Sequence, residues 1–192
     1  MNILPPGPWQ RGVYHSEHSI RSVPIGENEY GHTLFQTERT EMGQALYLFK
    51  YRNQPAQVEI IMDLIIRDAA LCEFIQEMGA IIPIPPSNVA RLYQPTLVVS
   101  ERISKYFKIP LLTQVLATTN REQVKNLDIS DRANIIRQSS VIDFSQLKNG
   151  EKYLLFDDIF SSGSTLGEYA RLLKERGTGE IYAFTLTRTK GR

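Results

Sequence analysis

The chain has 192 residues, of which 42% are hydrophobic, and its 22 basic and 21 acidic residues give a formal net charge of +1. This length and composition fit a single packed domain, and the near-neutral charge argues against direct binding to nucleic acid or to an anionic membrane. The single cysteine, Cys72, excludes an internal disulfide and a cysteine cluster for zinc, and it fits a reducing compartment such as the cytoplasm.

The N-terminal part of the chain has the weakest secondary-structure signal. Residues 1–10 are rich in Pro and Gly and lack the apolar core of a signal peptide. Weak alternation over residues 13–20 and 34–39 predicts short strands. His15 and His18 have a spacing that can bind a metal on a helix, but no third ligand is evident near them. We therefore interpret the two histidines as solvated side chains.

The next segment carries helical patterns. Residues 44–52 fit either a strand or the start of a helix, and Pro55 suits the first position of a helix. From there the spacing predicts one long helix that ends near Gly79. Its buried face would hold Val58, Ile61, Ile65, Ala69, Cys72 and Ile75. No apolar run in the chain approaches the ~20 residues that a membrane-spanning helix needs.

Strand and helix signals alternate from residue 80 onward, which predicts a parallel sheet with crossover helices. Residues 80–84 predict a strand that ends in a polar loop, where ligands sit in open α/β sheets. Pro95 starts a helical pattern, and residues 109–112 predict another short strand. Residues 117–140 are polar and basic, and a loop of that length is typical of a lid or of disorder. Residues 181–186 predict the last strand.

The most informative stretch follows this loop. Residues 153–156 are an apolar run typical of a fully buried strand, and Asp157 and Asp158 stand where that strand would end. A turn of small and hydroxyl-bearing residues comes next: Ser161, Ser162, Gly163, Ser164 and Thr165. A helical pattern begins there, with Thr165 and Glu168 as a capping box and Gly177 as its stop.

This order of elements suits a phosphorylated sugar. A helix N-terminus offers unpaired N–H groups and a partial positive charge, so the turn is suited to a phosphate monoester. Ionised carboxylates only accept hydrogen bonds, which suits Asp157 and Asp158 to neighbouring ribose hydroxyls. The metal site of a receiver-type domain is a rival interpretation of the acidic pair. That site needs the pair near the domain start, whereas here it lies near the end of the chain.

The stretch from Tyr153 to Leu166 resembles the phosphoribosyl-pyrophosphate (PRPP) loop of type I phosphoribosyltransferases. In that loop, apolar residues run into two acidic residues, two small or hydroxyl residues, a glycine, any residue and a threonine. Phe160 is bulkier than the aliphatic residue usual at its position. The resemblance implies an α/β fold, a Rossmann-like parallel sheet flanked by helices. It further implies a small N-terminal hood over residues 1–50 and a phosphoribosyltransferase core over residues 51–192.

Further residues look like those of ComF-type phosphoribosyltransferases, a group associated with competence and DNA utilisation in bacteria. These are Leu48-Phe49-Lys50-Tyr51, Ile82-Pro83-Ile84-Pro85, the Arg91 region, and Gln123, Leu127 and Arg132 before Asn134. The resemblance covers roughly residues 45–190. Members of the group usually begin with a Cys-rich zinc module, which this chain lacks. Their Arg-Gly-Phe-Asn-Gln segment appears here as Arg91-Leu92-Tyr93-Gln94-Pro95.

The resemblance implies roles for individual residues. Asp157 and Asp158 would be the catalytic pair that holds the ribose diol, and they would hold magnesium indirectly, through PRPP-bound Mg²⁺. Residues 161–165 would bind the 5-phosphate. Ser87, Arg91 and Arg121 are candidates for binding the diphosphate, although Arg91 also fits a surface arginine near a helix start.

The implied function is transfer of 5-phosphoribosyl from Mg-PRPP to a nitrogenous acceptor, a base or nucleotide-like molecule, with release of pyrophosphate. The acceptor cannot be read from the sequence. A non-catalytic PRPP or nucleotide sensor is an alternative, as is an effector subunit of a bacterial competence or antiviral complex. A homodimer or a protein partner is compatible with each of these functions.

Overall fold

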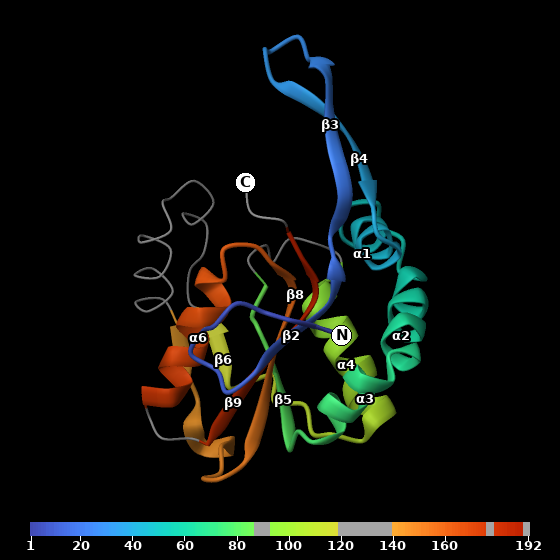
Figure 1. Cartoon of the computed structure of the whole chain (residues 1–192). Coiled ribbons are helices and arrows are strands. Elements are labelled where there is room, and N and C mark those ends of the chain that lie inside the picture. The colour runs from blue at the N-terminus through green and yellow to red at the C-terminus, as the bar shows by residue number, and fades with distance from the viewer. Residues whose placement is uncertain (87–92, 119–139, 176–178, 190–192) are drawn as a thin grey trace.

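A computed structural model describes residues 1–86, 93–118, 140–175 and 179–189 (Figure 1). Its centre is a five-stranded sheet in the order β1-β2-β9-β8-β5. The bounds of these strands are Asn2–Ile3 (β1), Gly12–Glu17 (β2), Glu180–Arg188 (β9), Lys152–Phe160 (β8) and Ala80–Pro83 (β5). β2, β9, β8 and β5 run parallel, and β1 is antiparallel to β2. The predicted parallel sheet is confirmed.

Helices cover both faces of this sheet (Figure 1). The helices on one face are α1 (Glu41–Tyr51), α2 (Gln57–Arg67), α3 (Ala69–Gln76) and α4 (Pro95–Phe107). Leu154 and Phe156 of β8 share a core with this group, whereas Tyr153 and Leu155 share a second core with α6 (Ser164–Glu175). Successive side chains of a strand point to opposite faces, so β8 supplies both cores. The apolar run at 153–156 is therefore buried on both sides, as predicted.

The predicted long helix from Pro55 to Gly79 is wrong, because the chain forms two helices there. α2 ends at Arg67, and the Asp68 side chain accepts a hydrogen bond from the Leu71 N–H at 3.1 Å, which caps the start of α3. Asp favours helix N-caps over helix interiors, so the break falls at this residue. The residues of the predicted face that are buried are Val58, Ile61, Ile65 and Ile75, whereas Ala69, beside the break, is exposed.

Other predicted elements were confirmed or corrected. Residues 44–52, for which strand and helix were both open, lie in and just after α1, and Pro95 is the first residue of α4. Residues 109–112 contribute a single bridge, from Leu111 to Ile81, rather than a strand. The capping box is wrong, since the Gly163 carbonyl accepts the Gly167 N–H at 2.8 Å and α6 starts at Ser164.

The N-terminal residues are divided between the core and a projecting ribbon. β3 (Ser19–Glu27) and β4 (Thr33–Arg39) form an antiparallel hairpin that stands away from the sheet (Figure 1). β2 instead pairs with β9 inside the sheet, with Gly12 opposite Ala183. The division of the chain into a hood over residues 1–50 and a core stays a prediction.

A second small pair of strands borders the predicted lid. β6 (Leu116–Thr118) and β7 (Ser140–Ile142) are antiparallel, and a short 3-10 helix at Phe144–Gln146 follows them. The segment between the two strands, residues 119–139, lies outside the described residues. Within the described part of the chain, no helix combines the length and the apolar character that crossing a membrane requires.

Truncation of Phe156 tests whether the middle of β8 supports the fold. Its ring is fully buried and lies 5.3 Å from that of Phe184 on β9, measured between centroids. Phe156→Ala should lower the free energy of unfolding by about 3–5 kcal/mol, because it removes buried surface and leaves a cavity. The exposed Ile25→Ala is the control, with an expected change within about 0.5 kcal/mol. Urea unfolding measures both, and equal small changes would contradict the described core.

Candidate functional site

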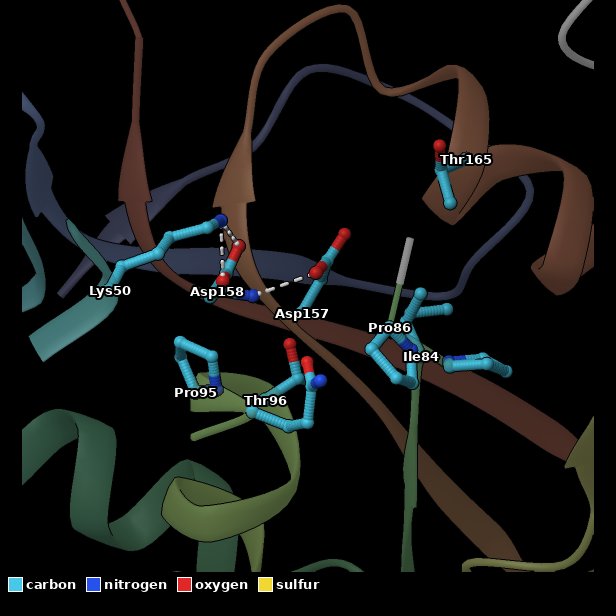
Figure 2. A pocket seen from close by; sticks show the side chains of 10 residues that line it. Lys50, Ile84, Pro86, Pro95, Thr96, Asp157, Asp158 and Thr165 are labelled. Carbon is cyan, nitrogen blue, oxygen red and sulfur yellow. Dashed lines mark hydrogen bonds and ion pairs between the residues drawn. The ribbon is translucent and has the colours of Figure 1, made fainter. Parts of the chain in front are cut away.

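The candidate site lies where β5 ends beside β8, with Pro83 opposite Phe156. β8 itself continues along β9 to Phe160, so the acidic pair lies within this strand, and the prediction that it stands at the end of the strand is wrong. The Ile84 N–H donates to the Phe156 carbonyl at 2.8 Å, which keeps the chain after β5 next to β8. A cavity of about 140 Å³ opens at this edge of the sheet (Figure 2). Its lining residues are Lys50, Ile84, Pro85, Pro86, Gln94, Pro95, Thr96, Asp157, Asp158 and Thr165. The carboxyl edge of a parallel sheet is the usual place for a ligand in such folds.

The two aspartates have different surroundings. Asp158 is buried, and both of its carboxylate oxygens accept hydrogen bonds from the Lys50 Nζ, at 2.9 Å and 2.7 Å. Asp157 is half-buried, and its Oδ1 accepts the backbone N–H of Asp158 at 2.8 Å. In Figure 2 the Asp157 carboxylate points toward Thr165, and that of Asp158 points toward Lys50. Neighbouring residues of a strand diverge in this way, so the pair faces two directions.

The turn after β8 forms a second, smaller cavity of about 90 Å³. Its lining residues are Asp157, Ile159, Phe160, Ser161, Ser162, Gly163, Ser164, Thr165 and Leu166. The Ser162 and Ser164 hydroxyls lie 2.9 Å apart, and the first turn of α6 begins at Ser164. Asp157 and Thr165 line both cavities, so the two hollows flank the same carboxylate.

Phe160 and Trp9 pack together next to the turn of residues 161–165. Phe160 is buried and meets Trp9 edge-to-face, with ring centroids 6.4 Å apart. Gly163 has a φ of +75°, and a Cβ at this position would lie 2.6 Å from the Phe160 ring. The turn therefore requires glycine for two reasons, its left-handed backbone and the aromatic ring beneath it. The bulk of Phe160, which departs from the usual pattern, fills this space.

The structure brings together most of the predicted site residues. Asp157, Asp158 and the five residues of the 161–165 turn lie around the two adjoining cavities. Ser87, Arg91 and Arg121, the candidates for binding the diphosphate, lie outside the described residues. Their roles stay predictions.

Sequence reasoning missed the cation that faces the acidic pair. Lys50 comes from α1, 108 residues before Asp158, and stands within the Leu48–Tyr51 motif, which carried a resemblance but no assigned role. The sequence offered one signal for it: Lys50 is a single lysine at the end of a helix face that is otherwise apolar. Thr96, buried at the start of α4 beside the same cavity, was also missed.

His15 and His18 are half-buried, so their interpretation as solvated side chains is wrong. His18 Nδ1 lies 3.1 Å from the hydroxyl of the buried Thr187. Burial lowers the pKa of both imidazoles, and the nearby charges of Arg39 and Lys50 lower the pKa of His18 further, against the opposing effect of Asp158. The described residues contain no group of three or more metal-ligating side chains.

No model of a known protein family matches the chain. The fold and the site define a parallel α/β protein with two adjoining cavities at the carboxyl edge of its sheet. In sequence the chain is similar to "Competence protein F" from Haemophilus influenzae, with 28% identity over 150 residues. The match covers 73% of this chain and 65% of that protein. This likeness confirms the expected resemblance to the ComF-type group.

Solved structures with a similar arrangement include several phosphoribosyltransferases. The orotate phosphoribosyltransferase from Aeropyrum pernix has 11% identity and a TM-score of 0.47, over 89% of this chain and 76% of that one. The adenine phosphoribosyltransferase from Saccharomyces cerevisiae has 10% identity and a TM-score of 0.49, over 88% and 83%. The purine phosphoribosyltransferase from Pyrococcus horikoshii has 17% identity and a TM-score of 0.43, over 70% and 83%.

Substitution of Gly163 tests the packing of the turn. Gly163→Ala should destabilise the protein by about 1–2 kcal/mol for its positive φ, and by more for the contact with Phe160. Gly150→Ala is the matched control, since Gly150 has a φ of +77° but open space around it. Adding Phe160→Leu should recover part of the loss in thermal unfolding, because it relieves the contact. Equal losses for the two glycine variants would contradict this account.

Stability should fall in mild acid because of the histidines. A folded-state pKa below the ordinary 6.5 means that the unfolded chain binds protons first. This contribution is fully present above pH 6.5 and is lost as the pH falls through the folded-state pKa. Urea unfolding of the protein at about pH 7.5 and about pH 5 should show the loss. His15→Gln with His18→Gln should reduce it, and an unchanged pH dependence would disprove the assignment.

Proposed function

We propose that this protein is a PRPP-binding phosphoribosyltransferase, which transfers 5-phosphoribosyl from Mg-PRPP to a nitrogenous acceptor and releases pyrophosphate. One observation carries the proposal: two cavities flank Asp157, one at the start of α6 and the other beside Lys50 and Pro85. A ribose of PRPP has a phosphate at C5 and a diphosphate at C1. Its hydroxyls lie between these two ends, as Asp157 lies between the two cavities.

The smaller cavity suits the 5-phosphate. Residues 161–165 contribute small side chains and hydroxyls, and the first turn of α6 presents backbone N–H groups and the positive end of its dipole. Asp157 and Asp158 would accept hydrogen bonds from the ribose hydroxyls. A carboxylate has about four lone-pair sites, so Asp158 can bind Lys50 and a hydroxyl together.

Magnesium fits this site as part of the substrate. Asp157 and Asp158 offer the oxygen ligands that Mg²⁺ prefers, and no larger cluster of ligating side chains exists among the described residues. The ion would neutralise charge on the diphosphate. Asp157 and Asp158 would hold the ribose through its hydroxyls, so they would hold the ion indirectly, through PRPP.

The proposed reaction needs no protein nucleophile. It requires that the protein position the substrates and stabilise the charge that develops on C1. The bond between C1 and the diphosphate oxygen breaks with its electron pair leaving on pyrophosphate, and the acceptor nitrogen supplies the pair for the new C1–N bond. C1 carries developing positive charge in between. A neighbouring carboxylate stabilises that charge, and the two cavities hold the sugar in a fixed orientation.

The second candidate function is a PRPP or nucleotide sensor, or an effector subunit, that acts through a partner protein. It is favoured by the hairpin β3–β4, where large hydrophobic side chains are exposed together. These are Ile20, Val23, Ile25, Tyr30, Leu34 and Phe35. Under either function we place the protein in the cytoplasm, where its single thiol, Cys72, stays reduced.

Removal of both carboxylates tests the ribose site. Asp157→Asn together with Asp158→Asn should weaken Mg-PRPP binding at least about 100-fold, because each lost charged acceptor costs on the order of 1.5–3 kcal/mol. Titration calorimetry measures the affinity, and thermal unfolding confirms that the variant is folded. Asp63→Asn, on the exposed face of α2, is the matched control. An unchanged affinity in the double variant would end the assignment.

Turnover separates the enzyme from the sensor. The wild-type protein should release pyrophosphate from Mg-PRPP when the correct base or nucleotide-like acceptor is supplied from a panel. Tight PRPP binding without pyrophosphate release for any member of the panel would favour the sensor. Gel filtration with candidate partner proteins then tests whether the hairpin takes part in a complex.

A further inference from the structure

The ion pair between Lys50 and Asp158 sets the charge of the larger cavity. Among the described residues that line it, Lys50 is the one cation, and Asp157 and Asp158 are the two anions. The side chains of Lys50 and Asp158 are 14% and 10% exposed, so water screens their charges only partly. Without Lys50, two carboxylates would face an incoming anionic ligand. With it, half of that repulsion is offset at the wall of the cavity.

The ammonium of Lys50 retains a donor for a ligand. An ammonium group has three N–H donors. Two of them go to the two oxygens of Asp158, and no third hydrogen-bond partner of Lys50 appears in the described part of the chain. The third N–H is available at the wall of the cavity, where Lys50 itself forms part of the lining (Figure 2).

The position of Lys50 is held from both ends of α1. At the N-terminus the Thr40 hydroxyl accepts the Gly43 N–H at 3.0 Å and caps the helix. Near the C-terminus Phe49 is buried, and its ring lies 6.1 Å from that of Tyr93, just before α4. Lys50 is therefore positioned by a well-packed helix, and its ammonium group is already bound to Asp158 in the absence of a ligand.

Lys50 also lies on the side of the site away from the serine-rich turn. It lines the cavity that contains Pro85, Pro86 and Gln94, and it does not line the cavity of residues 161–165. A ribose whose 5-phosphate occupied the turn would direct its C1 substituent into the cavity of Lys50. The charge of Lys50 would then act on that substituent more than on the 5-phosphate.

We propose that Lys50 makes this site select a ribose with a diphosphate at C1 over ribose 5-phosphate. This inference rests on the proposed function and assigns the selectivity to one residue outside the PRPP loop. Lys50 donates one hydrogen bond to the diphosphate and two to Asp158, which remains its counter-ion. Lys50 is thus a specificity-determining residue, and Asp158 positions it.

The test compares two ligands, Mg-PRPP and ribose 5-phosphate, by titration calorimetry on the full chain. Lys50→Met keeps the length of the side chain and removes the charge. It should weaken Mg-PRPP binding at least about tenfold and ribose 5-phosphate binding less than about threefold, because a single charge-assisted hydrogen bond is lost. Lys50→Arg should recover part of the PRPP affinity. Lys152→Met, at the opposite end of β8 and paired with Glu77, is the matched control and should change neither affinity.

A second pair of variants keeps the test decisive if Lys50→Met fails to fold, since it strands a buried carboxylate. Asp158→Asn retains the ammonium, so the preference for PRPP should persist even if both affinities fall. Asp158→Asn with Lys50→Met removes both charges, and the preference should drop at least about tenfold relative to Asp158→Asn alone. Equal losses for the two ligands whenever Lys50 is removed would overturn the inference. Failure of the wild type to bind either ligand would instead overturn the proposed function.

Discussion

The burial of β8 between two helical layers is the constraint on which the site depends. Its residues 153–156 have no exposed face, so the strand is held by both cores and by β9 and β5 on its two edges. Polar side chains are then confined to the part of the strand that leaves the cores, which is where Asp157 and Asp158 stand. The same strand ends in Phe160, whose ring supports the turn. The position of the carboxylates and the shape of the turn therefore follow from a single packed element.

The sequence was most informative where local rules and tertiary packing agree. An apolar run, an acidic pair and a glycine turn before a helix all act over a few residues, so β8, the turn and α6 were predictable. The break at Asp68 was missed because the apolar spacing on both sides continues in phase, and only the capping preference of one aspartate ends α2. The start of α6 was misplaced by two residues for a similar reason, since Gly163 and Thr165 both suit a helix start.

The ion pair of Lys50 and Asp158 belongs to a different class of feature. It joins a helix in the first third of the chain to a strand near its end, and no spacing rule connects residues so far apart. The half-burial of the two histidines was hidden for the same reason, because it results from distant residues: Leu64 and Asp68 near His15, and Thr187 of β9 beside His18. The motifs therefore predicted the two carboxylates, Asp157 and Asp158. Only the fold shows that Lys50 forms an ion pair with Asp158.

The pairing of β2 with β9 has a consequence for how the protein is made. Gly12 lies opposite Ala183, so β2 cannot find its parallel neighbour until the chain has been synthesised as far as β9. Closing so large a loop is slow, and an unpaired strand edge invites association with other nascent chains in the interval. β2 can thus pair with β1 early in synthesis, but its other edge stays unpaired until β9 arrives.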